Sequence, residues 1–347
     1  MLKYATWLEK CLKDGDVIVR RLAPPVLFGR ILPSSQLNKW LRHIDKLVIG
    51  AIQVLVVARQ YDVAHITDHS NAILGIVCLS PIVTITCHDV IAIKASRGGF
   101  SGVRLRRAAR LYQLLVLRGL GRVDNIICAS SNTSDEVRAL LPSADITTIE
   151  HPLNRHFDLH CPRLKSEKPF ILHIGGATWY KNRDGVIRLF AVLRSNSQFQ
   201  DHQLVLAGRR LTDSEKALAI ALDVSTACVE IVDPEDDRID NLYRSADCLL
   251  FPSRYEGFGW PIIEARALGC PIITSNIPPM SEIGGPFALF IDPAANPVEN
   301  AQKIIDGWEQ LQRRAGENRQ GMEAFSPELA SERYRKFFRE FLPNVKK

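Results

Sequence analysis

The segment with the clearest chemical potential runs from Glu256 to Glu264 and reads Glu-Gly-Phe-Gly-Trp-Pro-Ile-Ile-Glu. It follows an apolar run, Cys248-Leu-Leu-Phe, that is typical of a buried strand, and Pro261 suits the first turn of a helix. The two glycines let the backbone approach a ligand closely, and the free N–H groups at a helix start favour a phosphate. The two carboxylates can accept hydrogen bonds from paired hydroxyls of a sugar or ribose. The segment therefore predicts a nucleotide-sugar site.

The elements around this segment alternate between β-branched runs and helical patterns. In the second half we expect strands at 170–174, 203–207, 228–232, 248–251 and 271–274, with a helix at 184–193 and two amphipathic helices after 297. In the first half we expect strands at 16–20, 62–66, 81–86 and 124–128, and helices at 36–59 and 103–120. The stretch 152–168, with two prolines and no period, is typical of a linker. Strand–helix alternation on both sides of a linker predicts two α/β domains.

The block from Leu242 to Pro271, with E-G-F-G-x-P-x-x-E-A-x-A-x-G-x-P in register, resembles the signature of the large family of retaining glycosyltransferases numbered four. The likeness continues downstream and covers nearly all of the second half. It implies the α/β GT-B fold, in which two Rossmann-like doubly wound domains face a central cleft. We expect an acceptor-side domain at 1–155, a nucleotide-sugar-binding domain at 156–325, and a C-terminal helix at 326–347 that packs back on the first domain.

The resemblance also implies roles for individual residues. Glu264 matches the glutamate that binds the ribose hydroxyls, and Glu256 matches the one that contacts the donor sugar. Lys181, in the loop that begins at Gly175, matches the lysine that neutralises the diphosphate leaving group. A fixed cation is what the departure of a diphosphate requires. The backbone of the remaining members of the donor site would meet the sugar and diphosphate: Gly175, Gly257, Phe258 and Gly259.

The loop after the 170–174 strand departs from the commonest form of the family. Many members have an arginine where this sequence has Gly176. Arg183, Arg209 or Arg210 could supply the missing charge. We favour Arg209, because it directly follows the strand that ends at Gly208.

In the first half, Val-Thr-Ile-Thr-Cys-His88-Asp resembles the strand-end histidine motif of the family. That resemblance places His88 near the donor sugar and the reaction centre, as a catalytic residue. The alternative interpretation is a loop histidine whose ring is satisfied by the protein itself. Asp68 and His69 end the preceding strand and are weaker candidates at the same edge.

The N-terminus departs further from the family. Residues 4–12 are typical of the first helix, so the usual first strand and its glycine-rich loop have no counterpart ahead of it. Three explanations stay open: a misplaced or truncated start, a degraded enzyme, or a site that is completed differently.

Charge is uneven in the 347 residues, whose formal net charge is +6. Seven arginines fall in 97–122, with no acid between Gly98 and Gly121. Such a patch attracts anionic partners, or it is a solvated helix face. With leucines among the arginines, 103–120 resembles a docking face for an anionic membrane surface or a lipid diphosphate. A nucleic-acid role is disfavoured, because only two aromatic residues, Phe100 and Tyr112, lie among the patch's arginines.

Eight scattered cysteines without C-x-x-C spacing indicate free thiols in a reducing compartment. No signal peptide or membrane span is visible, so we expect a cytoplasmic protein, with peripheral contact at the inner face of the membrane.

These observations predict a glycosyltransferase that moves a mannose- or glucose-type hexose from a nucleoside diphosphate sugar to a glycan or lipid-linked acceptor in polysaccharide biosynthesis. We expect no cofactor and no metal, because Asp14-Gly-Asp16 precedes its predicted strand, whereas a metal-dependent transferase needs such a pair at a strand's carboxyl end. A glycoside hydrolase has no need of a phosphate cradle between its acids. The alternative function is a catalytically silent GT-B-like partner subunit of another transferase.

Overall fold

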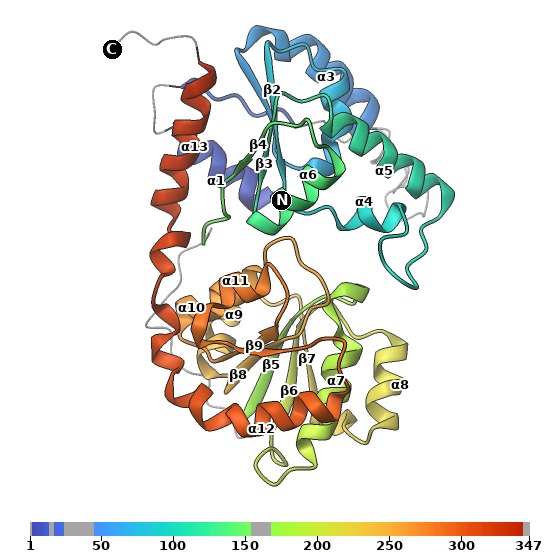
Figure 1. The fold of residues 1–347 in the computed structure, drawn as a ribbon, viewed down its shortest axis with the longest axis vertical. Coiled ribbons are helices and arrows are strands. Elements are labelled where there is room, and N and C mark those ends of the chain that lie inside the picture. The colour runs from blue at the N-terminus through green and yellow to red at the C-terminus, as the bar shows by residue number, and fades with distance from the viewer. Residues whose placement is uncertain (1, 14–16, 24–44, 154–167, 343–347) are drawn as a thin grey trace. The chain divides into compact units, whose positions relative to one another are not determined.

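The computed structural model describes residues 2–13, 17–23, 45–153 and 168–342, which divide into two compact units (Figure 1). The first unit consists of Met1–Asn154 together with Pro327–Lys347, and the second of Arg155–Ser326. The chain therefore completes the second unit before its last helix joins the first. The divisions expected after 155 and after 325 each differ from these by one residue.

Four parallel strands form the described sheet of the first unit, in the order β1-β2-β3-β4. Their bounds are Val63–Ile66 (β1), Ile82–Cys87 (β2), Asn125–Cys128 (β3) and Ile146–Thr148 (β4). β2 and β3 are almost wholly buried, as parallel strands are when helices cover both faces of the sheet. Three of the strands predicted for this half are confirmed, and β4 was not predicted.

The strand predicted at 16–20 is wrong for the part that the structure describes, and Asp16 lies outside the described residues. Residues 17–20 are not part of a strand, and Ile18 is 90% exposed. A run of β-branched residues becomes an interior parallel strand only where both of its faces are covered. Here exposed and half-buried side chains alternate, so one side of the segment faces solvent.

Helices complete the first unit. Their bounds are Leu2–Lys13 (α1), Asp45–Ile49 (η2, a π-helical turn), Gly50–Val57 (α3), Ala58–Gln60 (η3), His69–Ile76 (η4), Ile91–Ser96 (α4), Arg107–Leu120 (α5), Ser131–Leu140 (α6) and Pro327–Phe341 (α13). The helix predicted at 36–59 is confirmed from residue 45, and residues 36–44 lie outside the described ranges. The helix predicted at 103–120 begins later, because Arg106 is extended and precedes the first helical residue.

The C-terminal helix α13 packs against α1 within the first unit. Tyr4 of α1 and Tyr334 of α13 are fully buried, and their hydroxyl oxygens lie 2.7 Å apart. The hydroxyl of Tyr4 also hydrogen-bonds Thr86 Oγ1 of β2 at 2.8 Å. Burial raises the pKa of Tyr4 to about 12, so this buried hydroxyl stays neutral. One hydrogen-bonded chain thus joins the sheet to the first and last helices of the chain.

The second unit has a six-stranded parallel sheet in the order β10-β9-β8-β5-β6-β7. The strands are Phe170–Gly175 (β5), Gln203–Gly208 (β6), Cys228–Val232 (β7), Cys248–Phe251 (β8), Ile272–Ser275 (β9) and Leu289–Ile291 (β10). The α-helices are Arg183–Arg194 (α7), Asp213–Ala221 (α8), Asp236–Ser245 (α9), Trp260–Leu268 (α10), Met280–Gly284 (α11) and Pro297–Arg313 (α12). Short 3₁₀ turns cover Trp179–Lys181, Ser225–Ala227, Gly285–Phe287, Ala315–Arg319 and Met322–Phe325.

The second sheet contains all five strands predicted for this half. Its strand order reverses between β5 and β8, which makes the sheet doubly wound. The described part of the first sheet runs in sequence order, without a reversal. Ligands of open α/β sheets bind outside the carboxyl ends of the strands, at the point of reversal. In this chain that point is the junction of β5 and β8.

Candidate functional site

Two loops meet at the carboxyl ends of β5 and β8. The first follows Gly175 and the second follows Phe251, and two hydrogen bonds join them directly. The backbone N–H of Arg254 donates to the carbonyl oxygen of Tyr180 at 2.7 Å, and the side-chain amide of Asn182 donates to the carbonyl oxygen of Pro252 at 3.0 Å. The predicted lysine loop and the predicted glutamate loop therefore form one structure.

Lys181 and Glu256 form an ion pair in this structure. The distance from Lys181 Nζ to Glu256 Oε1 is 2.7 Å, and the two side chains are 18% and 8% exposed. Lys181 Nζ also lies 4.9 Å from the centre of the Phe251 ring. The structure thus brings together two residues that lie 75 positions apart and that sequence reasoning assigned to opposite parts of the donor.

Two glycines at this edge are required by backbone geometry. Gly208 ends β6 with φ +124°, and a Cβ atom there would lie 2.7 Å from the carbonyl oxygen of Gly175. Gly259 has φ +107°, and its Cβ would lie 2.8 Å from Ile283 Cδ1. Gly259 is also the N-cap of α10, so it sets how the backbone enters the helix whose first N–H groups face the expected phosphate.

The helix start predicted at Pro261 is confirmed. Pro261 lies in the first turn of α10, and Gly269 ends the helix in the left-handed conformation at φ +70°. Gly257 and Phe258 are buried in the loop before the helix, and Phe258 is 4% exposed. The aromatic ring of Phe258 meets the edges of Trp260 and Phe325, with centroid distances of 6.2 and 6.0 Å. Packing of this side chain fixes the loop, which leaves the backbone as the part that could meet a ligand.

Glu264 lies on α10, where the hydroxyl of Tyr243 donates to its Oε2 at 3.0 Å. Tyr243 belongs to α9 and is fully buried. A buried donor of this kind restricts the rotamer of the carboxylate, which matters for a residue expected to bind two ribose hydroxyls at once. Sequence reasoning missed Tyr243, because nothing in the motif indicates which residue of α9 faces α10.

Arg183 and Arg209, two of the arginines proposed to supply the charge missing at Gly176, have different surroundings in the structure. Arg183 is 3% exposed, lies 3.2 Å from Glu215 and donates to the carbonyl oxygen of Arg209 at 3.0 Å, so it supports the loop. Arg209 is exposed, and its Cγ lies 3.5 Å from where a Cβ of Gly176 would be. The side chain of Arg209 therefore lies beside the position at which the family usually carries its arginine.

His173, which sequence reasoning did not single out, lies in β5 beneath the lysine loop. It is fully buried, and its Nδ1–H donates to the carbonyl oxygen of Leu250 at 2.9 Å. Its Nε2 has no hydrogen-bond partner among the residues that the structure describes, and it would lie 3.3 Å from a Cβ at Gly175. Burial lowers the pKa of His173 to about 4, so Nε2 carries a lone pair at neutral pH. The sequence did contain a signal that could have identified His173: it is a histidine inside an apolar strand, two residues before Gly175-Gly176.

His88 lies in the first unit, directly after β2, and is 6% exposed. Its Nε2 lies 2.9 Å from the carbonyl oxygen of Thr67, and its Nδ1 lies 2.7 Å from Nε2 of His151. A carbonyl only accepts, so His88 Nε2 carries a hydrogen. Burial lowers the pKa of His88 to about 4, so the ring is neutral and Nδ1 accepts from His151. Both nitrogens therefore bond protein groups, as in the alternative interpretation, and a catalytic role for His88 stays a prediction.

The two weaker candidates of the first unit have structural partners. Asp68 caps the turn η4, where its carboxylate accepts from the backbone N–H of Ser70 at 2.8 Å. His69 Nδ1 lies 3.9 Å from Asp68 Oδ1. Neither residue is assigned a chemical role by these contacts.

In the ranges that the structure describes, no three His, Cys, Asp or Glu side chains lie close enough together to hold a metal ion. None of the helices in those ranges has the length and apolar character needed to cross a bilayer.

Comparison with known proteins identifies relatives of the second unit and of the whole fold. Residues 159–322 match the sequence model of the family described as glycosyl transferases group 1. The O-antigen chain mannosyltransferase B of Escherichia coli is 30% identical over 134 residues, which are 36% of this chain and 33% of that protein. Across the first three curated relatives, the match spans 30% to 55% of their length.

Among solved structures, sucrose-phosphate synthase from Thermosynechococcus elongatus superposes with a TM-score of 0.75 at 18% identity, over 97% of this chain and 92% of that one. HepE from Anabaena, solved in complex with UDP-glucose, gives a TM-score of 0.66 at 14% identity, over 86% and 84% of the two chains. At these identities the likeness shows the fold, and it covers both units of this chain.

Proposed function

Because residues 159–322 form a glycosyl transferases group 1 domain and the chain has the GT-B fold, we propose that the protein is a hexosyltransferase in polysaccharide biosynthesis. It transfers a mannose- or glucose-type sugar from a nucleoside diphosphate donor to a glycan or lipid-linked acceptor, with retention of the anomeric configuration. The O-antigen mannosyltransferase relative supports the sugar type and the pathway class. A similar fold solved with UDP-glucose supports the class of donor.

The ion pair between Lys181 and Glu256 carries this proposal. It holds a cation and a carboxylate 2.7 Å apart, sheltered from solvent, where two glycine-bearing loops and a helix N-terminus meet. In our proposal the ion pair opens when the donor binds, and each of the two side chains then contacts the donor. Glu256 accepts hydrogen bonds from the donor sugar, and the ammonium group of Lys181 turns to the diphosphate.

Lys181 then acts on the step in which the glycosidic bond to the diphosphate breaks. The leaving group gains negative charge as that bond lengthens, and a preorganised cation stabilises the transition state more than the ground state. Arg209, beside Gly176, adds a second positive charge at the same place. Because these side chains would supply the charge that a metal supplies in other transferases, we expect transfer without a divalent cation.

The first prediction concerns Lys181. Lys181→Ala is expected to lower transfer about 10²- to 10³-fold, the effect of removing one group that stabilises transition-state charge. The measurement is release of nucleoside diphosphate by the full-length protein, with UDP-, GDP- and ADP-sugars and a glycan acceptor, in the presence of EDTA or of Mg²⁺. Lys303→Ala, which removes an exposed lysine from α12, is the matched control.

Three outcomes of this experiment would each contradict a part of the proposed function. Equal rates for Lys181→Ala and Lys303→Ala would contradict the role of Lys181. A rate that EDTA abolishes would contradict metal-independent transfer. Donor binding without turnover on any acceptor would favour the silent partner subunit.

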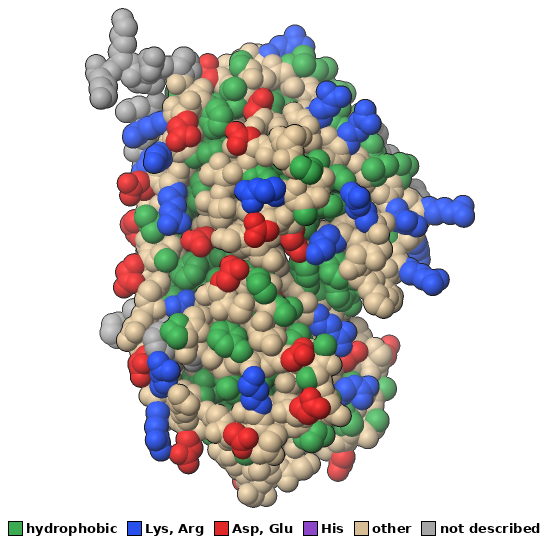
Figure 2. Space-filling model, in the orientation of Figure 1, with side chains coloured by type: hydrophobic (Ala, Val, Ile, Leu, Met, Phe, Trp, Pro, Cys, Tyr) green, Lys and Arg blue, Asp and Glu red, His purple; other side chains and the backbone are tan. Residues whose placement is uncertain are grey.

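We also propose that the protein works at the cytoplasmic face of a membrane, as a peripheral protein. The seven described cysteines are all free thiols, which fits a reducing compartment. Leu111 and Leu114 of α5 are 59% and 60% exposed among arginines, and Figure 2 shows Lys and Arg side chains gathered over the region where Figure 1 labels α5. Sedimentation with liposomes tests this, and equal binding to neutral and anionic vesicles would count against it.

A further inference from the structure

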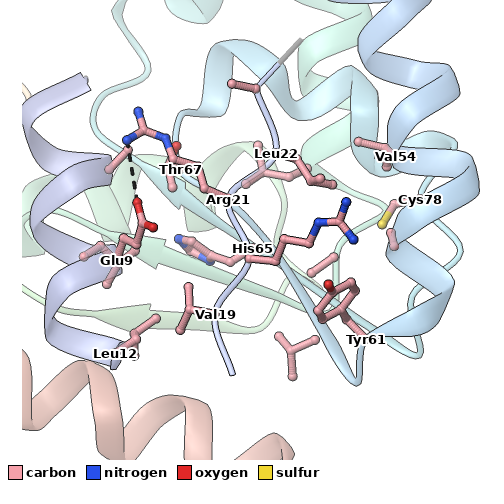
Figure 3. A pocket seen from close by; sticks show the side chains of 18 of the residues that line it. Glu9, Leu12, Val19, Arg21, Leu22, Val54, Tyr61, His65, Thr67 and Cys78 are labelled. Carbon is pink, nitrogen blue, oxygen red and sulfur yellow. Dashed lines mark ion pairs between the residues drawn. The ribbon is translucent and has the colours of Figure 1, made fainter. Parts of the chain in front are cut away.

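The first unit contains a cavity of about 580 Å³ that the donor site does not use. Figure 3 shows α1 and α3 on opposite sides of it, with the segment that carries Val19, Arg21 and Leu22 crossing between them. β1 supplies a further wall, including His65. The volume is that of a site for a small organic ligand.

The walls of this cavity are mainly hydrocarbon. Leu8 and Leu12 line it from α1, Val54 from α3, Val63 from β1 and Phe338 from α13. Apolar cavities hold water poorly and bind apolar molecules instead. A ligand that fills this space must therefore present hydrocarbon to it.

The imidazole that faces the cavity does not change this character. Both ring nitrogens of His65 are hydrogen-bonded, to Thr84 Oγ1 at 2.8 Å and to Thr86 Oγ1 at 3.0 Å. Burial lowers the pKa of His65 to about 3, so the ring is neutral in the physiological range. The one buried acid among the lining residues, Asp45, has an interaction within the protein. His65 and Asp45 therefore present no unpaired charge to a ligand in the buried part of the cavity.

Positive charge lies instead on the exposed segment at the edge of the cavity. Arg20 and Arg21 both line it and are both exposed. Arg21 NH1 donates to Thr6 Oγ1 at 3.1 Å and lies 3.7 Å from Glu9 Oε2, an ion pair drawn as a dashed line in Figure 3. Glu9 is itself bonded by Lys13 at 2.7 Å. Two cations, Arg21 and Lys13, thus share one carboxylate, and exposed pairs of this kind are weak enough for a phosphate to compete.

The helix α3 links the cavity to the surface. Val54 faces the cavity, while Ile52 and Val56 of the same helix are each 56% exposed and Leu55 is 38% exposed. An ordinary surface helix turns polar residues to water, whereas a helix that is apolar all round is buried in protein or in lipid. η4 packs against both α3 and the arginine-rich α5. One side of this unit thus combines exposed hydrocarbon with arginines, as a membrane-surface element does.

We propose that this cavity binds the hydrocarbon chain of a phosphorylated lipid, whose phosphate lies at Arg20 and Arg21 and whose chain enters along α3. The proposal rests on the proposed lipid-linked acceptor and names the part of the lipid that the protein holds. The shared chemistry is one hydrocarbon chain with a phosphate. An isoprenyl phosphate and an acyl phospholipid are its two sources.

The test measures binding alone, by calorimetry with the full-length protein in detergent-free buffer, without a sugar donor. The probes are farnesyl phosphate, lysophosphatidic acid, farnesol and inorganic phosphate. We expect farnesyl phosphate or lysophosphatidic acid to bind with a negative heat-capacity change, farnesol to bind more weakly, and inorganic phosphate not to bind. Whichever of the two lipids binds more tightly identifies the source. Because no transfer is measured, failure of this proposal is distinct from failure of the transferase proposal.

Two tryptophan substitutions give the decisive comparison. Val54→Trp fills the cavity and is expected to lower lipid affinity at least tenfold, whereas Ile220→Trp places the same side chain on the exposed side of α8 in the second unit and leaves affinity unchanged. Replacing Arg20 and Arg21 with alanine is expected to reduce phosphorylated-lipid affinity to that of farnesol, with Lys303→Ala/Arg313→Ala, which removes two exposed cations of α12, as control. Equal affinity of Val54→Trp and Ile220→Trp, with circular dichroism showing both folded, overturns the proposal, as does absence of binding by either lipid.

Discussion

At the scale of single residues, the carboxylates of the donor site are held by partners outside their motif. Glu256 is paired with Lys181 from another loop, and Glu264 accepts from the buried hydroxyl of Tyr243. These contacts set where each carboxylate can reach before a donor arrives. The geometry therefore makes Tyr243 a positioning residue for the ribose site in our proposal.

The second prediction tests that role. Glu264→Gln should weaken donor binding about 10- to 100-fold, because hydrogen bonds to a charged group contribute roughly 1.5–3 kcal/mol. Tyr243→Phe should weaken it by less than tenfold, in KM and not in kcat, because only the orientation of Glu264 is lost. Tyr112→Phe removes a hydroxyl donor from the first unit and should leave donor binding unchanged. A change in kcat alone for Tyr243→Phe would contradict this assignment.

The third prediction concerns the tautomer of His88. Because Nε2 donates to Thr67 and Nδ1 accepts from His151, nitrogen-15 NMR at pH 7 should find Nε2 protonated and Nδ1 bare. His151→Leu removes the donor, and His151→Gln replaces it with an amide. If His88 acts in transfer, kcat should fall about tenfold in the Leu variant and recover in the Gln variant. A His88 ring that titrates near pH 6.5 in the wild type would contradict the assigned contacts.

At the scale of elements, the donor site depends on how strands end. β5, β6 and β8 end at one edge of the sheet, and their loops are held there by glycines that no other residue replaces without strain. The backbone of Gly208 approaches Gly175, while Gly259 turns the chain into α10. Gly259 of the sequence motif is thus required by the fold as well as by any ligand.

The fourth prediction follows from Gly259. Gly259→Ala should destabilise the protein by about 1–3 kcal/mol, because the backbone is left-handed there and the added Cβ would lie 2.8 Å from Ile283 Cδ1. Donor binding should weaken as well, because α10 would have to move. Gly316→Ala is the control, since a Cβ there meets nothing within 4 Å. Chemical denaturation of both variants measures the difference, and equal stabilities would refute the strain argument.

At the scale of the whole molecule, the chain builds the first unit from two separate stretches. Residues near the N-terminus and the helix α13 share one buried cluster, in which Tyr4, Tyr334 and Phe338 pack with Ile127 of β3. The first unit therefore requires the last helix, although the whole second unit lies between them in sequence. Both units also contain neutral histidines: half-buried His65 with buried His88 and His151 in the first, and buried His173 in the second.

The fifth prediction is a loss of stability in acid. Burial lowers the pKa of His88 and His173 to about 4, from 6.5 in an unfolded chain. Below pH 6.5 the unfolded state binds protons that the folded state excludes, so the free energy of unfolding should fall as the pH drops from 6.5 towards 4. Above pH 6.5 these residues should contribute no slope. Urea titrations at pH 7.5 and 5.0 measure the effect, which His65→Gln should reduce.

Much of the fold could be predicted from local pattern. The apolar runs gave every strand of the second sheet except β10, because an interior parallel strand is apolar on both faces wherever it occurs. The strand prediction for 17–20, which rested on a similar run of β-branched residues, was wrong, because composition does not show whether a neighbouring strand exists to pair with it. The leucine pattern also predicted too early a start for α5. The backbone of Arg106 is extended, so the helix begins only after it.

The sequence by itself determined the type of site, since the spacing from Glu256 to Glu264 with its glycines depends on one strand, one turn and one helix. Only the tertiary structure decided which distant groups complete it. Lys181 contacts Glu256 because β5 and β8 are neighbouring strands. Arg183 pairs with Glu215, whereas Arg209 lies beside Gly176. Tyr243 orients Glu264 through a hydrogen bond. It likewise showed the ring of His88 bonded on both sides, and a hydrocarbon cavity assembled from α1, β1, α3 and α13. Contacts of this kind depend on which elements become neighbours in space, and the periodicity of one segment does not record its neighbours.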